Sequence, residues 1–208
     1  MPSKGSQFDL LRHGQVDGPA ALYGTTDVEL SAQGWHSVRH QVSQLKRPQQ
    51  LICSPLKRCR LFAQTLAQEW QLPLHIEPGL REFDFGLLDG IPFDQLNEHW
   101  PHLAAFGQNP FVHHLPQAET LADFNQRIAN CWQKLTEKFA KQHNLVICHG
   151  GVIRQILAQL LPVKWQEPDW YSQLQVPYAS LSRITIADYE EAKPVIQFIA
   201  KPASNEAL

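Results

Sequence analysis

One stretch decides the interpretation of the chain: Phe8-Asp9-Leu10-Leu11-Arg12-His13-Gly14-Gln15. Its apolar part is short, as in a buried strand, and it runs directly into a cation, an imidazole and a glycine. In open α/β sheets, ligands bind beyond the carboxyl ends of the strands, where the N-termini of helices present unpaired N–H groups. We therefore expect Arg12 and His13 at the ligand-binding edge of such a sheet.

Outward from this stretch, short apolar runs alternate with helical periodicity, which predicts an α/β sheet with helices on its faces. Further strands are predicted at 50–53, 74–76, 144–148, 181–186 and 195–200. Helices are predicted after a Ser31 cap, after Ser54-Pro55 with a capping hydroxyl, over 121–139, and after 149–151. Residues 83–117 have the weakest pattern and are interpreted as an irregular insertion with two short helices, inside a single domain of residues 1–208.

Composition and charge exclude several classes of protein. Apolar residues make up 43% of the 208 residues, and 18 basic against 20 acidic side chains give a net charge of −2. This balance argues against nucleic-acid or anionic-membrane partners. His149 and Arg154 interrupt the most apolar stretch, 145–163, and the N-terminal apolar run is too short for a signal peptide. Four cysteines without CxxC spacing suggest buried thiols, so we expect a soluble cytoplasmic protein.

Two more groups are predicted at the same edge of the sheet. Arg58 lies in the first turns of the helix after the second strand, and His149 follows the strand at 144–148. Alone, the first is typical of a solvated helix charge and the second of a turn. Together with Arg12 and His13 they indicate an anion site, and phosphate is the obvious anion. Gly14, Gly150 and Gly151 would let the backbone approach it closely.

Five ordered blocks between residues 8 and 154 resemble the histidine phosphatase (phosphoglycerate mutase-like) superfamily. They are LRHGQ at 11–15, YGTTDVELSAQG at 23–34, CSPLKR at 53–58 with TLA at 65–67, LRE at 80–82 with Gly86 and Gly90, and CHGGVIR at 148–154. The resemblance implies a phosphoglycerate mutase-like three-layer α/β/α sandwich with a mostly parallel central sheet.

The resemblance also implies a role for each site residue. His13 would attack phosphorus and form a phosphohistidine, and Glu82 would protonate the leaving alkoxide. Arg12 and Arg58 would each hold phosphoryl oxygens with paired N–H bonds, and His149 would complete the cage. With this much fixed positive charge, no metal and no other cofactor is expected. Further phosphate or substrate contacts are expected from Gly150, Gln15, Gly24 and Thr25.

The sequence departs from the family pattern at two positions. Val16 and Pro19 stand where the family often has Thr and Asn, which puts the leaving-group pocket in doubt rather than the phosphate cage. In the insertion, His113 and His114 are interpreted as exposed loop side chains, with a pocket wall or a metal contact as the alternative. Trp100 and Phe106 are weaker candidates for stacking on a ring substrate.

The length, the compact insertion and Ala118-Glu119-Thr120 before the long helix most resemble the bacterial α-ribazole phosphatases, which act on α-ribazole 5′-phosphate in cobalamin biosynthesis. We therefore expect a metal-independent phosphomonoester hydrolase with that substrate. A broad-specificity small-molecule or sugar phosphatase is the nearest alternative, because a fold does not fix a substrate. The expected partner is a small-molecule phosphate monoester, and a homodimer is compatible with the sequence.

Two other classes rank lower. A phosphoglycerate mutase must hold a small carboxylate and exclude water, yet no Lys, Arg or Tyr lies between Gly90 and Gln117. A phosphate-binding module without catalysis ranks last, because the nucleophile, the proton donor and the three cage residues are all present.

Overall fold

The computed structural model describes residues 5–203, and its centre is the strand that carries the first motif. This strand, β1 (Ser6–Arg12), pairs in parallel with β4 (His143–Cys148) and antiparallel with β5 (Leu181–Ile186). The other strands are β2 (Gln50–Cys53), β3 (Leu74–Ile76) and β6 (Val195–Lys201). The six strands of this described part lie in the order β3-β2-β4-β1-β5-β6. The first four run parallel, so the prediction of a mostly parallel sheet is confirmed.

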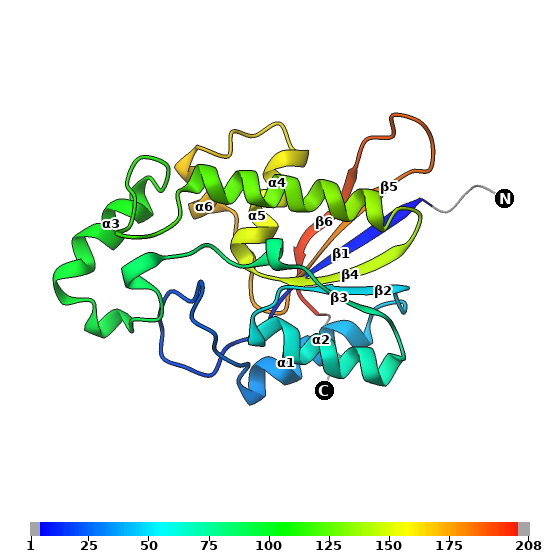
Figure 1. Ribbon diagram of the computed structural model, residues 1–208, viewed down its shortest axis with the longest axis horizontal. Helices are drawn as coiled ribbons and strands as arrows, with labels where there is room; N and C mark the ends of the chain where they lie inside the picture. The colour runs from blue at the N-terminus through cyan, green and yellow to red at the C-terminus, as the bar shows by residue number, and fades with distance from the viewer. Residues whose placement is uncertain (1–4, 204–208) are drawn as a thin grey trace.

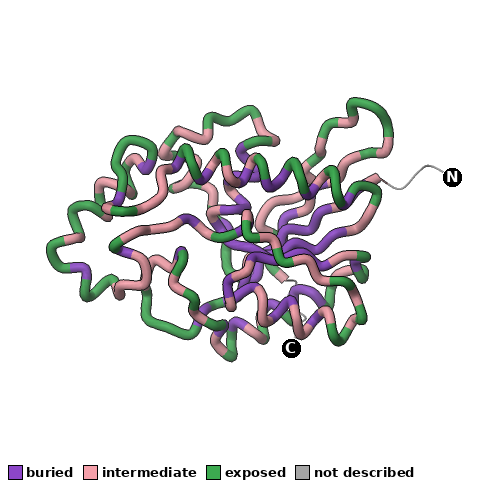
Figure 2. The backbone as a smooth tube through the Cα atoms, in the orientation of Figure 1, coloured by how far each residue is buried: buried purple, intermediate pink, exposed green. Residues whose placement is uncertain are grey.

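Helices cover both faces of the sheet, which confirms the three-layer α/β/α arrangement (Figure 1). The helices α1 (Ala32–Ser43) and α2 (Lys57–Trp70) cover one face, and α4 (Leu121–Lys138) and α5 (Gly150–Leu160) cover the other. Side chains alternate along β1, so that Phe8 and Leu10 pack with α4 and α5 while Leu11 packs with α1 and α2. Figure 2 shows the buried strands between the two helical layers. None of the helices between residues 5 and 203 is long and apolar enough to cross a membrane.

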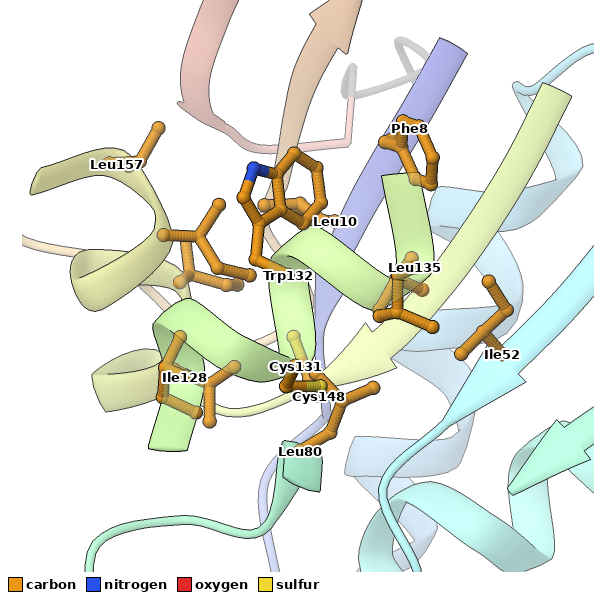
Figure 3. Close-up of a cluster of buried hydrophobic side chains, with 14 of the residues drawn as sticks. Phe8, Leu10, Ile52, Leu80, Ile128, Cys131, Trp132, Leu135, Cys148 and Leu157 are labelled. Carbon is orange, nitrogen blue, oxygen red and sulfur yellow. The ribbon is translucent and has the colours of Figure 1, made fainter. Parts of the chain in front are cut away.

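The core under α4 also anchors the short turn that precedes Glu82. Leu80, the last residue of the 3₁₀ turn η1 (Pro78–Leu80), is completely buried, and it lies beside Cys131 and Cys148 (Figure 3). Trp132 of α4 packs edge-on against Phe8 of β1, with 5.0 Å between ring centroids. The apolar contacts of Leu80 therefore tie the turn just before Glu82 to the main core.

All four cysteines are free and buried, as the spacing predicted. Burial raises the pKa of Cys53 and of Cys131 to about 12. Burial also raises the pKa of Cys59 and of Cys148 far above the ordinary range. These thiols are protonated at neutral pH, and the thiol is a poor nucleophile compared with the thiolate.

Two capping hydroxyls were predicted, and one of them was wrong. Ser31 caps α1 as predicted, since its hydroxyl accepts a hydrogen bond from the Gly34 N–H at 3.0 Å. Ser54 does not cap α2, which begins at Lys57. The Lys57 N–H donates instead to the carboxylate of Asp27 at 2.6 Å. The cap of α2 thus comes from a segment thirty residues earlier, which no local pattern reveals.

The stretch 83–117 contains one α-helix rather than two. This helix, α3 (Trp100–Gln108), follows three 3₁₀ turns, η2 (Gly86–Leu88), η3 (Phe93–Gln95) and η4 (Asn97–His99). Leu88, Leu96 and Leu115 form a small core of their own. The short helix α6 (Pro168–Gln173) was not predicted, although a proline at its first position is a known start signal. Both α3 and α6 lie at the end of the molecule where the first motif ends (Figure 1).

A buried ion-pair network joins the three central strands. Asp9 on β1 lies directly opposite Arg183 on β5, and its side chain is fully buried. Arg183 donates to both carboxylate oxygens, at 2.7 and 3.0 Å, and His143 on β4 lies 2.8 Å from one of them. Burial alone would raise the pKa of Asp9, but the hydrogen bonds from His143 and Arg183 and the charge of Arg183 outweigh it and lower that pKa.

The network predicts that replacing the Asp9 carboxylate lowers stability in a pH-dependent way. Because the folded-state pKa of Asp9 lies below its ordinary value of 3.8, the network stabilises the fold above that value and loses its effect as pH falls through the lowered pKa. We expect Asp9→Asn to reduce the free energy of unfolding by about 3 kcal/mol at neutral pH, measured by urea denaturation, and by progressively less as pH falls below 3.8. Asp17→Asn, at an exposed carboxylate, is the control; equal losses in both variants would refute the assignment.

Candidate active site

The pairing of β1 with β4 brings two histidines together. Arg12 lies opposite Cys148 in the parallel register, so the next residues of the two strands, His13 and His149, are neighbours at the carboxyl edge of the sheet. The His13 N–H donates to the Cys148 carbonyl at 3.0 Å. The two imidazole rings lie 5.1 Å apart between centroids. The structure therefore brings together the two motifs that the sequence placed at one edge.

The contacts of His13 fix its tautomer. Its Nδ1 lies 2.7 Å from the Gly14 carbonyl, which can only accept, so Nδ1 carries the proton and Nε2 keeps its lone pair. Burial, followed by the charges of Arg58 and Arg12, lowers the pKa of His13 well below 6.5. Gly14 cannot be replaced easily, because a Cβ there would lie 2.2 Å from the Gly34 carbonyl of α1. His13 is thus a neutral imidazole with an unprotonated Nε2, a form that can act as a nucleophile.

Arg58 is completely buried, and the protein itself uses most of its donors. Its Nη2 donates to the carbonyls of Tyr23 and Gly24 at 2.8 and 2.7 Å, and its Nη1 donates to that of Thr26 at 3.0 Å. Its Nε donates to Nδ1 of His149 at 3.2 Å. Four of the five N–H groups of the guanidinium are therefore engaged. This differs from the expected paired contact with a phosphoryl group, for which Arg58 would have to exchange partners.

His149 is likewise enclosed by protein contacts. Because Arg58 only donates, Nδ1 of His149 accepts, and its proton sits on Nε2, which lies 2.7 Å from the hydroxyl of Ser54. Burial and then the charge of Arg58 lower the pKa of His149 well below 6.5. Neither His149 nor Arg58 lines the open cleft. The hydroxyl that was expected to cap α2 is thus turned toward this imidazole.

Arg12 carries a buried donor without a partner. Its Nη1 donates to the Val176 carbonyl, and its guanidinium carbon lies 4.0 Å from the centroid of the Tyr178 ring. Its Nε is buried and has no hydrogen-bond partner within the described residues. Most buried polar groups in proteins are paired, so an unpaired N–H on a cation beside a cleft is the expected mark of an anion site.

Glu82 lines the same cleft. One carboxylate oxygen accepts from the Gly151 N–H at 3.0 Å, at the start of α5, and the other accepts from the Phe83 N–H at 3.1 Å. A Cβ at Gly151 would lie 2.3 Å from Glu82 Oε1, so the second glycine of the HGG motif is needed for this contact. The N–H groups of Gly151 and Phe83 thus fix the position of the Glu82 carboxyl group at the start of α5.

The cleft between these groups has a volume of about 390 Å³ and a largely aromatic wall. Arg12, His13, Glu82, Gly150 and Gly151 line it, and Arg154 and Ser172 add two further polar groups. Such a cleft suits a ligand with one anionic end and one ring-shaped or apolar end. The aromatic side chains come from three parts of the chain: Tyr23, then Phe83, Phe85, Phe106 and Phe124, then Tyr171 and Tyr178.

Three expected contacts do not reach the cleft. Gln15 is exposed, and Thr25 is exposed as well. The N–H groups of Gly24 and Thr25 donate to the carboxylate of Asp89, at 3.1 and 2.9 Å, so they are not free for a ligand. Of the predicted contacts beyond the five principal residues, the structure brings only Gly150 to the cleft wall.

Some of the candidate residues in the insertion line the cleft, and others do not. His113 and His114 are exposed, and they do not line the cleft, as their interpretation as loop side chains predicted. Trp100 is about half exposed and contacts Phe93 rather than the cleft. Phe106 does line the cleft. Val16, where the family often has Thr, is buried and lines the cleft as well, so this departure makes the wall more apolar.

No pattern in the sequence indicates the roles of Asp89 and Arg154. Asp89 accepts from four backbone N–H groups, those of Gly24, Thr25, Thr26 and Phe85, and so holds residues 24–26 in place. The same loop offers its carbonyls to Arg58. Asp89 precedes a glycine, and this pair indicates only a turn. Arg154 belongs to the HGG block, but nothing in its spacing reveals that it lines the cleft.

Comparison with known proteins agrees with this geometry. Residues 8–199 match the family model of the histidine phosphatase superfamily (branch 1). The chain is 25% identical over 155 residues to the uncharacterized phosphatase PhoE of Bacillus subtilis (strain 168), covering 73% of this chain and 75% of that one. It is 28% identical over 194 residues to a probable phosphoglycerate mutase, GpmB, of Yersinia enterocolitica, covering 89% and 86%.

The fold also matches a solved structure, that of the alpha-ribazole phosphatase of Shigella flexneri. The TM-score is 0.78 with 23% identity, and the match covers 94% of this chain and 96% of that one. The family match spans nearly the whole chain and includes all five sequence blocks. The protein is therefore a phosphatase-type enzyme that belongs to the histidine phosphatase superfamily, branch 1.

Proposed function

We propose that this protein hydrolyses small-molecule phosphate monoesters through a phosphohistidine on His13, without a metal ion. One observation carries the proposal: an unprotonated imidazole nitrogen and a carboxylate line the same cleft as the guanidinium of Arg12, whose buried Nε has no partner in the described residues. A phosphate monoester is a dianion, so a nucleophile needs its charge neutralised first, and Arg12 is the group placed to do so.

In the first half-reaction, Nε2 of His13 attacks phosphorus and the bond from phosphorus to the ester oxygen breaks. The leaving alkoxide takes a proton from the carboxyl of Glu82 and departs as an alcohol. In the second half-reaction, Glu82 takes a proton from water while the oxygen attacks phosphorus. The P–N bond breaks, inorganic phosphate leaves, and both side chains return to their starting states.

Arg58 and His149 support this chemistry although neither lines the cleft. The charge of Arg58 helps to keep His13 neutral, and the ring of His149 lies next to that of His13. For either residue to bind phosphoryl oxygens directly, as the family resemblance implies, it would have to exchange its contacts with the loop carbonyls or with Ser54. Such an exchange stays part of the proposal.

The wall of the cleft supports an aromatic leaving group. Seven aromatic side chains line the same cleft as His13, and a benzimidazole-type ring could stack on them with ring centroids about 4.5–7 Å apart. We propose α-ribazole 5′-phosphate as the substrate, which would place the enzyme in cobalamin biosynthesis. A broad-specificity phosphatase is the alternative, because an apolar wall with few polar anchors discriminates weakly among apolar groups.

Removing the nucleophile should separate binding from turnover. We expect His13→Ala to reduce phosphate release by about 10³-fold or more while inorganic phosphate still binds, as measured by calorimetry. The wild-type protein should take up an acid-labile label from a radioactive phosphate ester, and His13→Ala should take up none. His114→Ala, at an exposed histidine, is the matched control and should behave as wild type. Full turnover in His13→Ala would remove it as the nucleophile.

Removing the proton donor should make the rate depend on the leaving group. We expect Glu82→Gln to lower kcat/KM by about 10²–10⁴-fold for alkyl and phenyl phosphates, whose leaving groups need a proton, and little for 4-nitrophenyl phosphate. Initial rates across such a series measure this. Glu98→Gln, at an exposed glutamate, is the control. An equal loss for every ester would contradict the role of Glu82.

The substrate itself can be tested with a panel in excess EDTA. We expect kcat/KM for α-ribazole 5′-phosphate to exceed those for sugar, nucleotide and glycerate phosphates by at least about a hundredfold, or about 2.7 kcal/mol of transition-state discrimination. Flat, slow activity across the panel would favour the broad-specificity phosphatase. Interconversion of phosphoglycerates without phosphate release would favour a mutase, and loss of activity in EDTA would contradict the metal-independent mechanism.

A further inference from the structure

We propose that Arg127 and Glu119 form a clamp that positions Glu82 for proton transfer. Neither residue lines the cleft, so neither touches the substrate, and both act through the backbone around Glu82. The clamp joins α4 to residues 79–84, which we call the Glu82 segment. This inference rests on the proposed function, because it assigns these residues to the proton-transfer step of that reaction.

The guanidinium of Arg127 binds three carbonyls of the Glu82 segment. Its Nη1 donates to the carbonyls of Gly79 at 2.9 Å and Arg81 at 2.8 Å, and its Nη2 donates to that of Glu82 at 3.3 Å. The remaining contact of Nη2 is with Glu119 at 2.6 Å. The two terminal nitrogens of Arg127 are thus devoted to this segment and its partner.

Glu119 holds the Glu82 segment from its other end. The carboxylate oxygen that accepts from Arg127 also accepts from the Asp84 N–H at 2.9 Å, and the Glu119 N–H donates back to the Asp84 carbonyl at 3.2 Å. Hydrogen bonds therefore hold the backbone on both sides of Glu82 along the chain. The side chains of Arg127 and Glu119 are only 20% and 18% exposed, which protects the pair from solvent screening.

The Glu82 segment needs such a clamp because, after η1 ends at Leu80, it has no regular structure of its own. Residues 81–85 lie in neither a helix nor a strand, so no ladder of backbone hydrogen bonds satisfies their carbonyls. Buried Leu80 fixes the position of the turn, but an apolar contact does not fix the direction of the chain after it. The planar fork of Arg127 supplies that direction, because its donors point along fixed lines to several carbonyls at once.

The orientation of the backbone decides where the carboxyl of Glu82 lies. A general acid must stand within hydrogen-bond reach of the oxygen that it protonates, and a misplacement of about 1 Å can cost about 10²-fold in rate. Loss of the clamp should therefore slow the step that needs a proton and leave the attack of His13 on phosphorus intact. A residue that merely stabilised the fold would slow all substrates together.

The test is the leaving-group dependence of kcat/KM in Arg127→Gln. We expect a loss of about tenfold or more for alkyl and phenyl phosphates, and a loss of less than about threefold for 4-nitrophenyl phosphate. Arg127→Lys keeps the charge but loses the fork, so its losses should lie between those of wild type and Arg127→Gln. Glu119→Gln keeps an acceptor oxygen for Asp84 and should also show a smaller loss with the same dependence on the ester.

The matched control is Arg39→Gln on α1. Arg39 also makes two hydrogen bonds with a carboxylate, that of Glu69, at 3.0 and 2.6 Å, but it contacts neither the Glu82 segment nor the cleft. It should keep the wild-type pattern across the ester series. Melting temperatures of all variants show whether each is folded, and if Arg127→Gln is unfolded, Arg127→Lys and Glu119→Gln decide the question.

The outcomes separate the clamp from the enzyme activity. If the wild type is active and its Arg127 variants lose the same factor in kcat/KM on every ester, or lose nothing, the clamp is overturned. The proposed function then still stands. A wild type that releases no phosphate from any ester overturns the proposed function before any variant is compared. A loss of kcat/KM confined to esters with poor leaving groups in both Arg127 variants, with Arg39→Gln unchanged, supports the clamp.

Discussion

The parallel pairing of β1 with β4 is the constraint on which the site depends. It sets Arg12 opposite Cys148, and the residues that follow leave the sheet together at its carboxyl edge. β2 lies on the other side of β4, so the helix that carries Arg58 starts from the same edge. A shift of this register by one residue would turn His13 to the other face of the sheet and away from His149. Strand pairing alone thus brings His13, His149 and the start of the Arg58 helix to the same edge of the sheet, and side-chain contacts then refine their positions.

Backbone groups, rather than opposite charges, stabilise the cations at this edge. Arg58 is completely buried, and its guanidinium is bound by three loop carbonyls and a neutral imidazole. Arg12 likewise donates to a carbonyl, that of Val176. Carbonyl dipoles solvate a buried cation but leave its charge in place. The positive field, which adds to burial in lowering the pKa of His13 and would attract a phosphate, therefore persists. A buried carboxylate partner would cancel it.

Local signals in the sequence predicted the strands, the Ser31 cap and the positions of the catalytic motifs, because each depends on neighbouring residues. The start of α2 depends on Asp27, and the loop that binds Arg58 depends on Asp89, sixty-three to sixty-five residues further along the chain. These partners meet only in the folded chain, so periodicity and capping rules do not reveal them. The same holds for the cleft, whose aromatic wall is drawn from the insertion, from α4, from α6 and from the loops after β1 and before β5.

The four buried cysteines have a consequence for the environments in which this fold can exist. Their thiols are uncharged at neutral pH, unpaired and shielded from solvent, so they offer little to oxidants, alkylating reagents or adventitious soft metals. No bond within the described residues forms or breaks when the surrounding thiol–disulfide potential changes. Stability should therefore be the same under reducing and oxidising conditions.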